Sequence, residues 1–395
     1  MTTTTPKYQP GVDFDENVRE DALDLVERLV QLYRDKSTDQ AEGQWREPVD
    51  NYADPQLWQR EIAAIHRTVP LPLAMTCEIK SPGSYKAINV AGTNVVITRD
   101  AQGEVHASLN ACRHRGSEVV PEGYGEVKRL TCPYHAWSYD LAGCLVGVYG
   151  EKTFGPVDRA ERSLISLPAE ERLGFVWVSL TPGTDLNLDT WLAGLEPFLR
   201  SFDLANGYHY STRELDGPNW KVVLDGYLEG YHFASLHRDT VFKTNLSNMT
   251  AFDTWGPHIR TAHALRTISD AAEQDPADWN PAHSVGVTMF MFPALAIAGG
   301  WRTHTAVSLI LPGTTWDTSR TQQIIVLRGE PSDDEEVKAA EHTRDWFYEV
   351  VLDEDYATGY GVQRSLQSLS GTDFVFGRNE PGVQHFHRVI KEMVQ

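Results

Sequence analysis

Cysteine is scarce in this chain, which has four cysteines among 395 residues. Four cysteines are too few to build the fold from disulfide bonds. The sequence also lacks an uninterrupted apolar run of about 18 residues, which a membrane-spanning helix needs. The first ten residues are polar and threonine-rich and lack the apolar segment of a secretory signal. We therefore expect a soluble, cytoplasmic protein with no membrane partner.

Positive charge is also limited, since 35 Lys and Arg residues face 55 Asp and Glu residues, for a formal net charge of -20. This charge disfavours nucleic acid and anionic membrane surfaces as partners. The glycine-rich fingerprint of dinucleotide-binding domains is missing as well, so we do not expect NAD(P)H to bind this chain directly. The overall composition is that of an ordinary globular protein.

The patterning of apolar residues divides the chain into regions of different character. Short strands and turns fill residues 76–180, including a hairpin signal around Ala91-Gly92-Thr93. Helical periodicity precedes this region, and helices alternate with strand-like runs after Pro182-Gly183. The simplest organisation is a β domain inserted into an α+β domain. The expected helices cover 13–34, 55–67 (capped by Asp54), 190–202, 221–237, 335–355 and 383–393, and the strand-like runs 284–311 and 321–327.

Two short cysteine–histidine motifs lie in the β region. Cys112-Arg113-His114 is followed, after 17 residues, by Cys132-Pro133-Tyr134-His135. Each motif offers one thiolate and one imidazole, so together they supply two of each. A structural zinc site is one interpretation. A zinc finger, however, places its cysteines in one half and its histidines in the other, whereas a two-iron cluster takes two thiolates on one iron and two imidazoles on the other.

A second group of candidate ligands follows in the chain. His232 and His237 are five residues apart, where a helix loosens or ends, and Asp353, Glu354 and Asp355 form an acidic segment further on. A histidine pair alone is weak evidence for a metal site.

The two motifs together resemble a known family. C-R-H-R-G and C-P-Y-H-A-W resemble the Rieske motif of ring-hydroxylating oxygenases, and the string from Asn219-Trp220-Lys221 to His237 resembles their mononuclear iron site. The resemblance implies an all-β Rieske [2Fe-2S] domain inserted into an α+β catalytic domain with a central antiparallel sheet and covering helices. The implied boundaries are an N-terminal helical part of the catalytic domain at 1–65, the Rieske domain at 66–182 and the catalytic domain at 183–395.

The resemblance also assigns roles to individual residues. It implies that Cys112, His114, Cys132 and His135 hold the [2Fe-2S] cluster, and that a mononuclear Fe(II) is held by His232, His237 and Asp355, which is preferred to Asp353. Glu229 takes the place of the carboxylate that links the first iron histidine to a cluster histidine of a neighbouring subunit, which implies a homotrimer. Many relatives have Asn seven residues before that histidine, where this chain has Asp225, so the role of Asp225 is in doubt.

The implied activity is that of the terminal, alpha-subunit component of an oxygenase. It would use O2 and electrons from a separate NAD(P)H-dependent reductase, with or without a ferredoxin. The apolar segment containing Phe290, Phe292 and Leu295 is expected to be a strand of the core, and a lining of the substrate pocket is the alternative. An aromatic or other largely apolar substrate is the leading expectation. Monohydroxylation, dihydroxylation and demethylation stay open. A Rieske-type electron carrier is the alternative, although a carrier needs neither His232, His237 nor the acidic segment.

Overall fold

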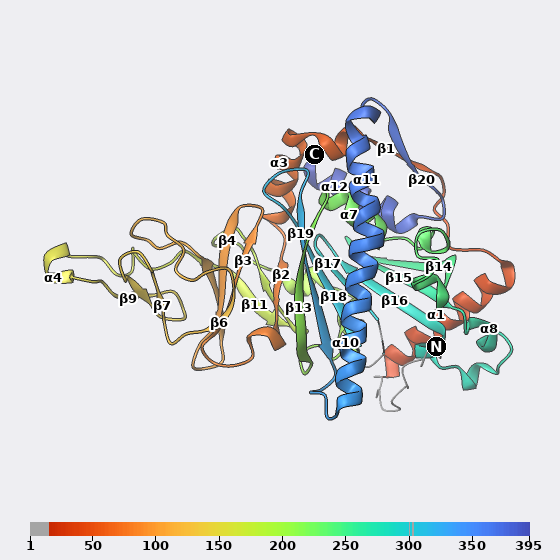
Figure 1. Ribbon diagram of the computed structural model, residues 1–395, viewed down its shortest axis with the longest axis horizontal. Helices are drawn as coiled ribbons and strands as arrows, with labels where there is room; N and C mark the ends of the chain where they lie inside the picture. Colours follow the sequence, from red (N-terminus) through yellow and green to blue (C-terminus); the bar gives the residue numbers. More distant parts are fainter. Residues whose placement is uncertain (1–15, 300, 302–303) are drawn as a thin grey trace. The chain divides into compact units, whose positions relative to one another are not determined.

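The computed structural model describes residues 16–299, 301 and 304–395, which fold into two compact units (Figure 1). The β unit comprises residues 62–191 and 204–206, and the α+β unit comprises the chain up to residue 61, residues 192–203 and residues 207–395. The β unit is thus inserted into the α+β unit, as expected. The chain passes between the units near residues 62 and 191, whereas the sequence placed the boundaries at 66 and 182.

The β unit contains three antiparallel sheets, with strand orders β10-β5-β4-β3-β6, β11-β12-β2 and β7-β8-β9. The predicted hairpin joins β3 to β4, and its turn residues Ala91 and Gly92 have φ of 48° and 83°. The elements of this unit are β2 Leu71–Met75, β3 Ser84–Val90, β4 Thr93–Arg99, β5 Val105–Leu109, β6 Gly123–Glu126, β7 Leu130–Thr131, β8 Ser138–Tyr139, β9 Leu145–Gly147, α4 Glu151–Phe154, β10 Ser166–Leu167, β11 Ala169–Arg172, β12 Phe175–Val178 and α5 Leu188–Trp191.

The α+β unit is built on a seven-stranded antiparallel sheet of order β13-β19-β18-β17-β16-β15-β14. Its strands are β13 Tyr208–Gly217, β14 Asn245–Trp255, β15 His258–Leu265, β16 Val285–Met291, β17 Leu295–Ala298, β18 His304–Pro312 and β19 Ser319–Leu327, with a separate pair β1 Trp45–Pro48 and β20 Asp373–Phe376. Its helices are α1 Glu16–Asp35, α2 Asp50–Ala53, α3 Pro55–Glu61, α6 Glu196–Arg200, α7 Trp220–Tyr227, α8 Ile268–Ala271, α9 Pro281–Ser284, α10 Asp334–Glu349, α11 Ala357–Ser365 and α12 Pro381–Val394.

The two faces of this sheet carry different helices. Arg260 of β15 forms an ion pair with Asp21 of α1, so α1 covers one face. Side chains alternate between faces along a strand, and the strand register therefore places His263, Ser308 and Thr321 on the other face. There α7 contacts β18, and α10 packs on β13, β18 and β19 (Figure 1). This second face is the one that supports the site described below.

Four of the expected helices are shorter or less regular than the patterning predicts. The helix expected over 55–67 is α-helical only from Pro55 to Glu61 and continues as a π-helix over Ile62–His66. Residues 190–202 form two short helices, α5 and α6, separated by a turn in which Gly194 has a φ of 82°. The helix expected over 221–237 ends at Tyr227. The helix expected over 335–355 changes into a π-helix at Val350. The helix expected from residue 13 is α1, observed from Glu16, and residues 13–15 lie outside the described residues, as do Met1 to Pro10.

None of the helices in the described part of the chain is both long and apolar enough to cross a lipid bilayer.

Candidate metal centres

Two loops of the β unit carry the cysteine–histidine motifs. The first follows β5, and the second joins β7 to β8. In each loop the residue four positions after the cysteine donates its backbone N–H to the cysteine carbonyl, from Gly116 to Cys112 at 2.8 Å and from Ala136 to Cys132 at 3.0 Å. Gly116 and Ala136 both have positive φ. The same turn is therefore used twice, and it presents a cysteine and a histidine each time.

The four candidate ligands fit a two-iron cluster. The side chains of Cys112 and Cys132 are buried, and the His114 and His135 ring centroids lie 4.6 Å apart. Nδ1 of each histidine is buried and has no hydrogen-bond partner in the described structure. Buried polar atoms without partners are rare, and a bound metal would supply the missing contact. Two thiolates and two imidazoles are the donor set of a Rieske [2Fe-2S] cluster.

The surroundings of these ligands are apolar and hydrogen-bonded. The Trp137 ring stacks on His114 at 5.0 Å between centroids. The Tyr139 hydroxyl lies 3.2 Å from Sγ of Cys112 and accepts the backbone N–H of Arg113 at 3.0 Å. Because its oxygen accepts from Arg113, the hydroxyl hydrogen of Tyr139 is available to the sulfur. Hydrogen bonds to cluster sulfurs are one of the factors that set the reduction potential.

A second group of ligands lies in the α+β unit. Nε2 of His237 is 3.0 Å from Oδ1 of Asp355, and Nε2 of His232 is 3.8 Å from the same oxygen. The three residues offer ligand atoms that all lie within 4.8 Å of one another. His232 begins a short 3-10 helix beyond the end of α7, His237 follows it, and Asp355 lies on the π-helix Val350–Tyr356. Two imidazoles and one carboxylate suit a ferrous ion held by a facial triad.

Each of these histidines uses its other ring nitrogen to contact a carboxylate. Nδ1 of His232 contacts Glu229, and Nδ1 of His237 lies 2.6 Å from Glu354, which also accepts the Thr240 hydroxyl at 2.6 Å. Such contacts fix the ring orientation and leave Nε2 free for the metal. Burial opposes protonation of His237, but the hydrogen bonds and charges of Asp355 and Glu354 raise its pKa. A bound metal would take the place of that proton.

Glu354 is a site residue that the sequence analysis missed, because only one carboxylate of the acidic segment 353–355 was assigned to the triad. The π-helix separates their roles: Asp353 is exposed, whereas Glu354 and Asp355 both reach His237. Short π-helical segments are frequent at functional sites. The signal in the sequence was the run of consecutive acidic residues. In a regular α-helix two neighbouring carboxylates would not both reach the His237 imidazole.

Asp225 does not join the triad. Its carboxylate accepts the Tyr52 hydroxyl at 2.7 Å and lies 2.8 Å from Nε2 of His387 on α12. Glu229 is close to the triad, since it contacts the His232 ring and accepts the backbone N–H of His232 at 3.3 Å.

The three apolar candidates lie in the core, which was the preferred interpretation of their segment. Phe290 is on the same sheet face as His263, and both Phe290 and Phe292 pack against Phe386 of α12, at 5.8 and 6.2 Å between ring centroids. Leu295 pairs with Met291 and Leu309, which places it on the opposite face, where α1 packs. All three candidates are fully or almost fully buried. The register therefore separates Leu295 from the metal ligands.

Two protein-family models match the chain. The Rieske [2Fe-2S] domain matches residues 69–155, and the catalytic domain of the ring hydroxylating alpha subunit matches residues 204–395. The first match contains all four candidate cluster ligands, and the second contains His232, His237 and Asp355. Together they cover more than two thirds of the chain.

Individual proteins are similar over parts of the chain. The glycine betaine monooxygenase oxygenase subunit of Pseudomonas aeruginosa strain UCBPP-PA14 is 32% identical over 48% of this chain and 44% of its own length. The large subunit of anthranilate 1,2-dioxygenase from Acinetobacter baylyi strain ATCC 33305 / BD413 / ADP1 is 30% identical over 51% of this chain and 44% of its own. The chain thus spans less than half the length of these relatives.

The fold has parallels among solved structures. The quaternary ammonium Rieske monooxygenase CntA, in complex with L-carnitine, superposes with a TM-score of 0.76 over 90% of this chain and 97% of that one, at 22% identity. With this fold, both family domains and both sets of ligands in one polypeptide, the chain belongs to the family of Rieske-type ring-hydroxylating oxygenase alpha subunits.

Proposed function

We propose that this chain is the terminal component of an oxygenase that uses O2 to oxidise a small organic molecule. The observation that carries the proposal is the triad of His232, His237 and Asp355, with ligand atoms within 4.8 Å of one another in the same chain as the cysteine–histidine loops. When bound, the [2Fe-2S] cluster would supply electrons, and a ferrous ion with three protein ligands would keep coordination positions free for O2. The donor would be a separate NAD(P)H-dependent reductase, with or without a ferredoxin.

Glu229 is proposed to connect the two centres between subunits of a homotrimer. One of its oxygens contacts Nδ1 of His232, and its side chain is only 11% exposed. The same carboxylate would accept a hydrogen bond from a cluster histidine of a neighbouring subunit. A head-to-tail arrangement of this kind closes into a ring. Within the chain itself, Glu229 holds the His232 ring in the orientation that directs Nε2 toward Asp355.

The substrate is proposed to carry a polar or charged group, which revises the aromatic or largely apolar substrate expected from the sequence. The sheet face that carries His263 holds the polar Thr288, Ser308 and Gln323 beside the apolar Ile310 and Ile325, and its Phe290 packs against Phe386. The hydroxyl of Tyr227 contacts Ser308 at 3.2 Å on this face. A site lined by polar groups discriminates strongly against ligands that leave those groups unpaired. A quaternary ammonium compound with a carboxylate and an aromatic acid both meet this requirement.

A pure electron carrier is the competing function. A carrier needs a cluster but has no use for a second group of ligands with its own carboxylate partners, Glu229 and Glu354. The two hypotheses differ in iron content, because an oxygenase should hold about three irons per chain and a carrier about two.

The deciding experiment measures substrate-dependent O2 uptake with a surrogate reductase, after anaerobic purification and iron analysis. The panel should contain carnitine, glycine betaine, benzoate, anthranilate and naphthalene. We expect uptake with at least one of the charged compounds and none with naphthalene. Uptake with naphthalene alone would contradict the proposed substrate class, and two irons per chain with no uptake would favour the carrier.

A further inference from the structure

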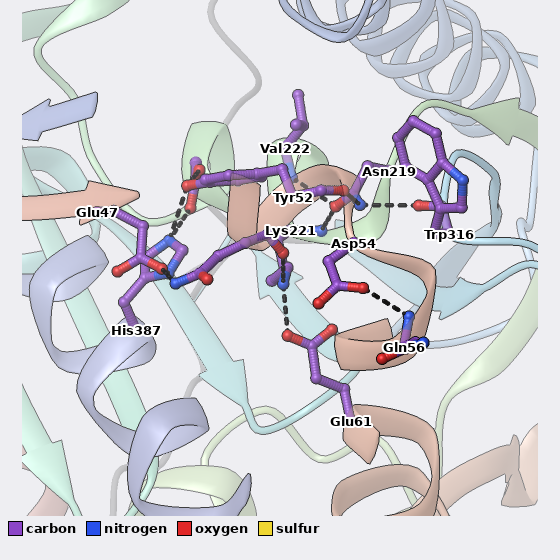
Figure 2. A network of polar contacts seen from close by, with 12 residues as sticks. Glu47, Tyr52, Asp54, Gln56, Glu61, Asn219, Lys221, Val222, Trp316 and His387 are labelled. Carbon is purple, nitrogen blue, oxygen red and sulfur yellow. Dashed lines mark hydrogen bonds and ion pairs between the residues drawn. The ribbon is translucent and has the colours of Figure 1, made fainter. Parts of the chain in front are cut away.

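A buried polar network joins three segments of the α+β unit that are far apart in the sequence (Figure 2). His387 of α12 lies between Glu47 of β1, Tyr52 of α2 and Asp225 of α7. Nε2 of His387 is 2.8 Å from Oδ1 of Asp225 and 3.1 Å from the Tyr52 hydroxyl, and Nδ1 is 3.7 Å from Oε1 of Glu47. The His387 side chain is 2% exposed, so these protein groups are its environment.

His387 is the ionisable partner of Asp225 in this network. Glu47 and Asp225 are two largely buried carboxylates, and each faces a different nitrogen of the His387 ring. The cation of Lys221 is also nearby, but its ammonium contacts Glu61 (Figure 2) and the backbone carbonyl of Asn51. Nε2 of His387 is within hydrogen-bond distance of Asp225, whereas Nδ1 is only at an ion-pair distance from Glu47, which also accepts hydrogen bonds from Trp45 and Asn51. The geometry therefore pairs His387 first with Asp225, and with Glu47 only at a longer distance.

This network is adjacent to residues 228–232, the loop that carries the candidate metal ligand His232. Asp225 is in the last turn of α7, and Glu229 and His232 follow the end of that helix. The start of α12 packs tightly on the same loop, since a Cβ at Gly382 would come within 2.6 Å of the Leu228 carbonyl oxygen. Burial raises the pKa of Glu380, at the N-terminus of α12, and the negative charges of Glu229 and Asp225 raise it further. An uncompensated carboxylate at Asp225 would therefore act on a region that is already rich in negative charge.

We propose that His387 is the counter-ion of Asp225, and that this pair is a positioning device that fixes the loop 228–232 and thereby the orientation of Glu229 and His232. The Tyr52 hydroxyl donates to the other oxygen of Asp225 at 2.7 Å, so both carboxylate oxygens have a partner in the network. The inference rests on the proposed metal site but requires no particular substrate or reaction. It assigns His387 an indirect role in metal binding, because the residue contacts none of the candidate metal ligands.

The test compares single and double substitutions. His387→Gln removes the positive charge and leaves two buried carboxylates, Asp225→Asn removes one carboxylate and leaves His387 with Glu47, and the double variant replaces the pair with two neutral amides. His385→Gln is the matched control, because His385 is on the same helix but contacts the Gly256 carbonyl instead. The readouts are the ferrous iron affinity, measured by competition with a chelator, and the EPR spectrum of the nitric oxide adduct of the ferrous site.

We expect His387→Gln to weaken iron binding about tenfold, the lower end of the effect of a lost outer contact, and to change the EPR spectrum. Asp225→Asn should have a smaller effect, and the double variant should recover most of the affinity, because breaking a buried pair costs more than replacing both members. If His387→Gln fails to fold while the double variant folds, the pair is equally supported.

Wild-type iron affinity in His387→Gln would overturn the proposal. So would effects that simply add in the double variant, or a double variant that fails to fold alongside the single one. A protein that shows the expected pattern of iron affinities but oxidises no substrate would instead contradict the proposed function and leave the ion pair intact.

Discussion

Glu354 lies 2.6 Å from Nδ1 of His237, and the next residue in the chain lies against the other nitrogen of the same ring. Outer carboxylates of this kind orient a ligating imidazole and typically contribute tenfold to a hundredfold to metal affinity. We expect Glu354→Ala to weaken ferrous iron binding by about tenfold to a hundredfold, and Thr240→Val, which removes the hydroxyl that holds Glu354, to have a smaller effect. Chelator competition measures both, and an unchanged affinity in Glu354→Ala would contradict this role.

Asp355 and Asp353 should behave differently although they are two residues apart. Asp355→Ala removes a triad ligand and should empty the mononuclear site, while the visible and EPR signals of the cluster persist because the two centres share no ligand. Asp353 is exposed, so Asp353→Ala should retain its iron and serves as the matched control. Iron content per chain, measured together with the cluster spectrum, distinguishes the two residues. The reverse outcome would show that the wrong carboxylate has been chosen.

Glu229→Gln tests the proposed link between the centres. Glutamine is nearly isosteric but lacks the charge that accepts hydrogen bonds from two imidazoles. Both metals should stay bound, and the oligomeric state should persist. The cluster should then remain reduced when substrate and O2 are mixed in, as followed by stopped-flow absorbance. Reoxidation of the cluster at the wild-type rate would place the link elsewhere.

Tyr139→Phe should lower the reduction potential of the cluster. The tyrosine hydroxyl lies 3.2 Å from Sγ of Cys112, and a hydrogen bond to a cluster sulfur stabilises the more electron-rich, reduced state. The substitution removes only that hydroxyl and keeps the ring in its buried position. Protein-film voltammetry measures the potential, with Tyr134→Phe, an exposed ring in the second cluster loop, as the control. An unchanged potential in Tyr139→Phe would show that the hydroxyl does not donate to the sulfur.

Stability should fall as the pH is lowered, partly because of His263. Burial lowers the pKa of this histidine to about 4. In the unfolded chain its pKa is about 6.5, so between these two pH values the unfolded chain binds a proton that the folded protein does not. The unfolded state is therefore favoured progressively from about pH 6.5 down to about pH 4, by up to about 3 kcal/mol for this residue.

Urea unfolding over this pH range should show a shallower dependence in His263→Gln than in wild type. His283→Gln, which removes an exposed histidine, should keep the wild-type slope. A slope that is unaffected by His263→Gln would mean that the buried imidazole is protonated in the folded protein.

Residues with strong local signals could be located from the sequence. The hairpin at Ala91-Gly92 occurs where the pattern placed it, and the candidate ligands His232, His237 and Asp355, named from the resemblance, lie with their ligand atoms within 4.8 Å of one another. In each case a short motif restricts the local structure, through a turn that needs positive φ or through ligands at fixed spacing. The helix cap at Asp54 belongs to the same class, since its carboxylate accepts the backbone N–H of Gln56 at 2.7 Å.

Features that depend on contacts between distant segments could not be read in this way. The partners of Asp225, Tyr52 and His387, are 173 residues before it and 162 residues after it. No local sequence pattern could therefore predict these contacts. The end of α7 at Tyr227 was missed because the residues beyond it keep helical apolar spacing while the ligand loop imposes another conformation. Leu295 looked equivalent to Phe290 in an apolar run, but only the strand register shows that the two face opposite sides of the sheet.

The π-helix at Val350–Tyr356 makes the length of this segment as important as its composition. An α-helix turns about 100° per residue, and the wider π-helical turn is what allows two consecutive carboxylates to contact both nitrogens of one imidazole. Losing a single residue from this segment would restore regular α-helix and rotate Asp355 away from His232. Variation among related sequences should therefore tolerate exchanges of side chains here far more readily than insertions or deletions.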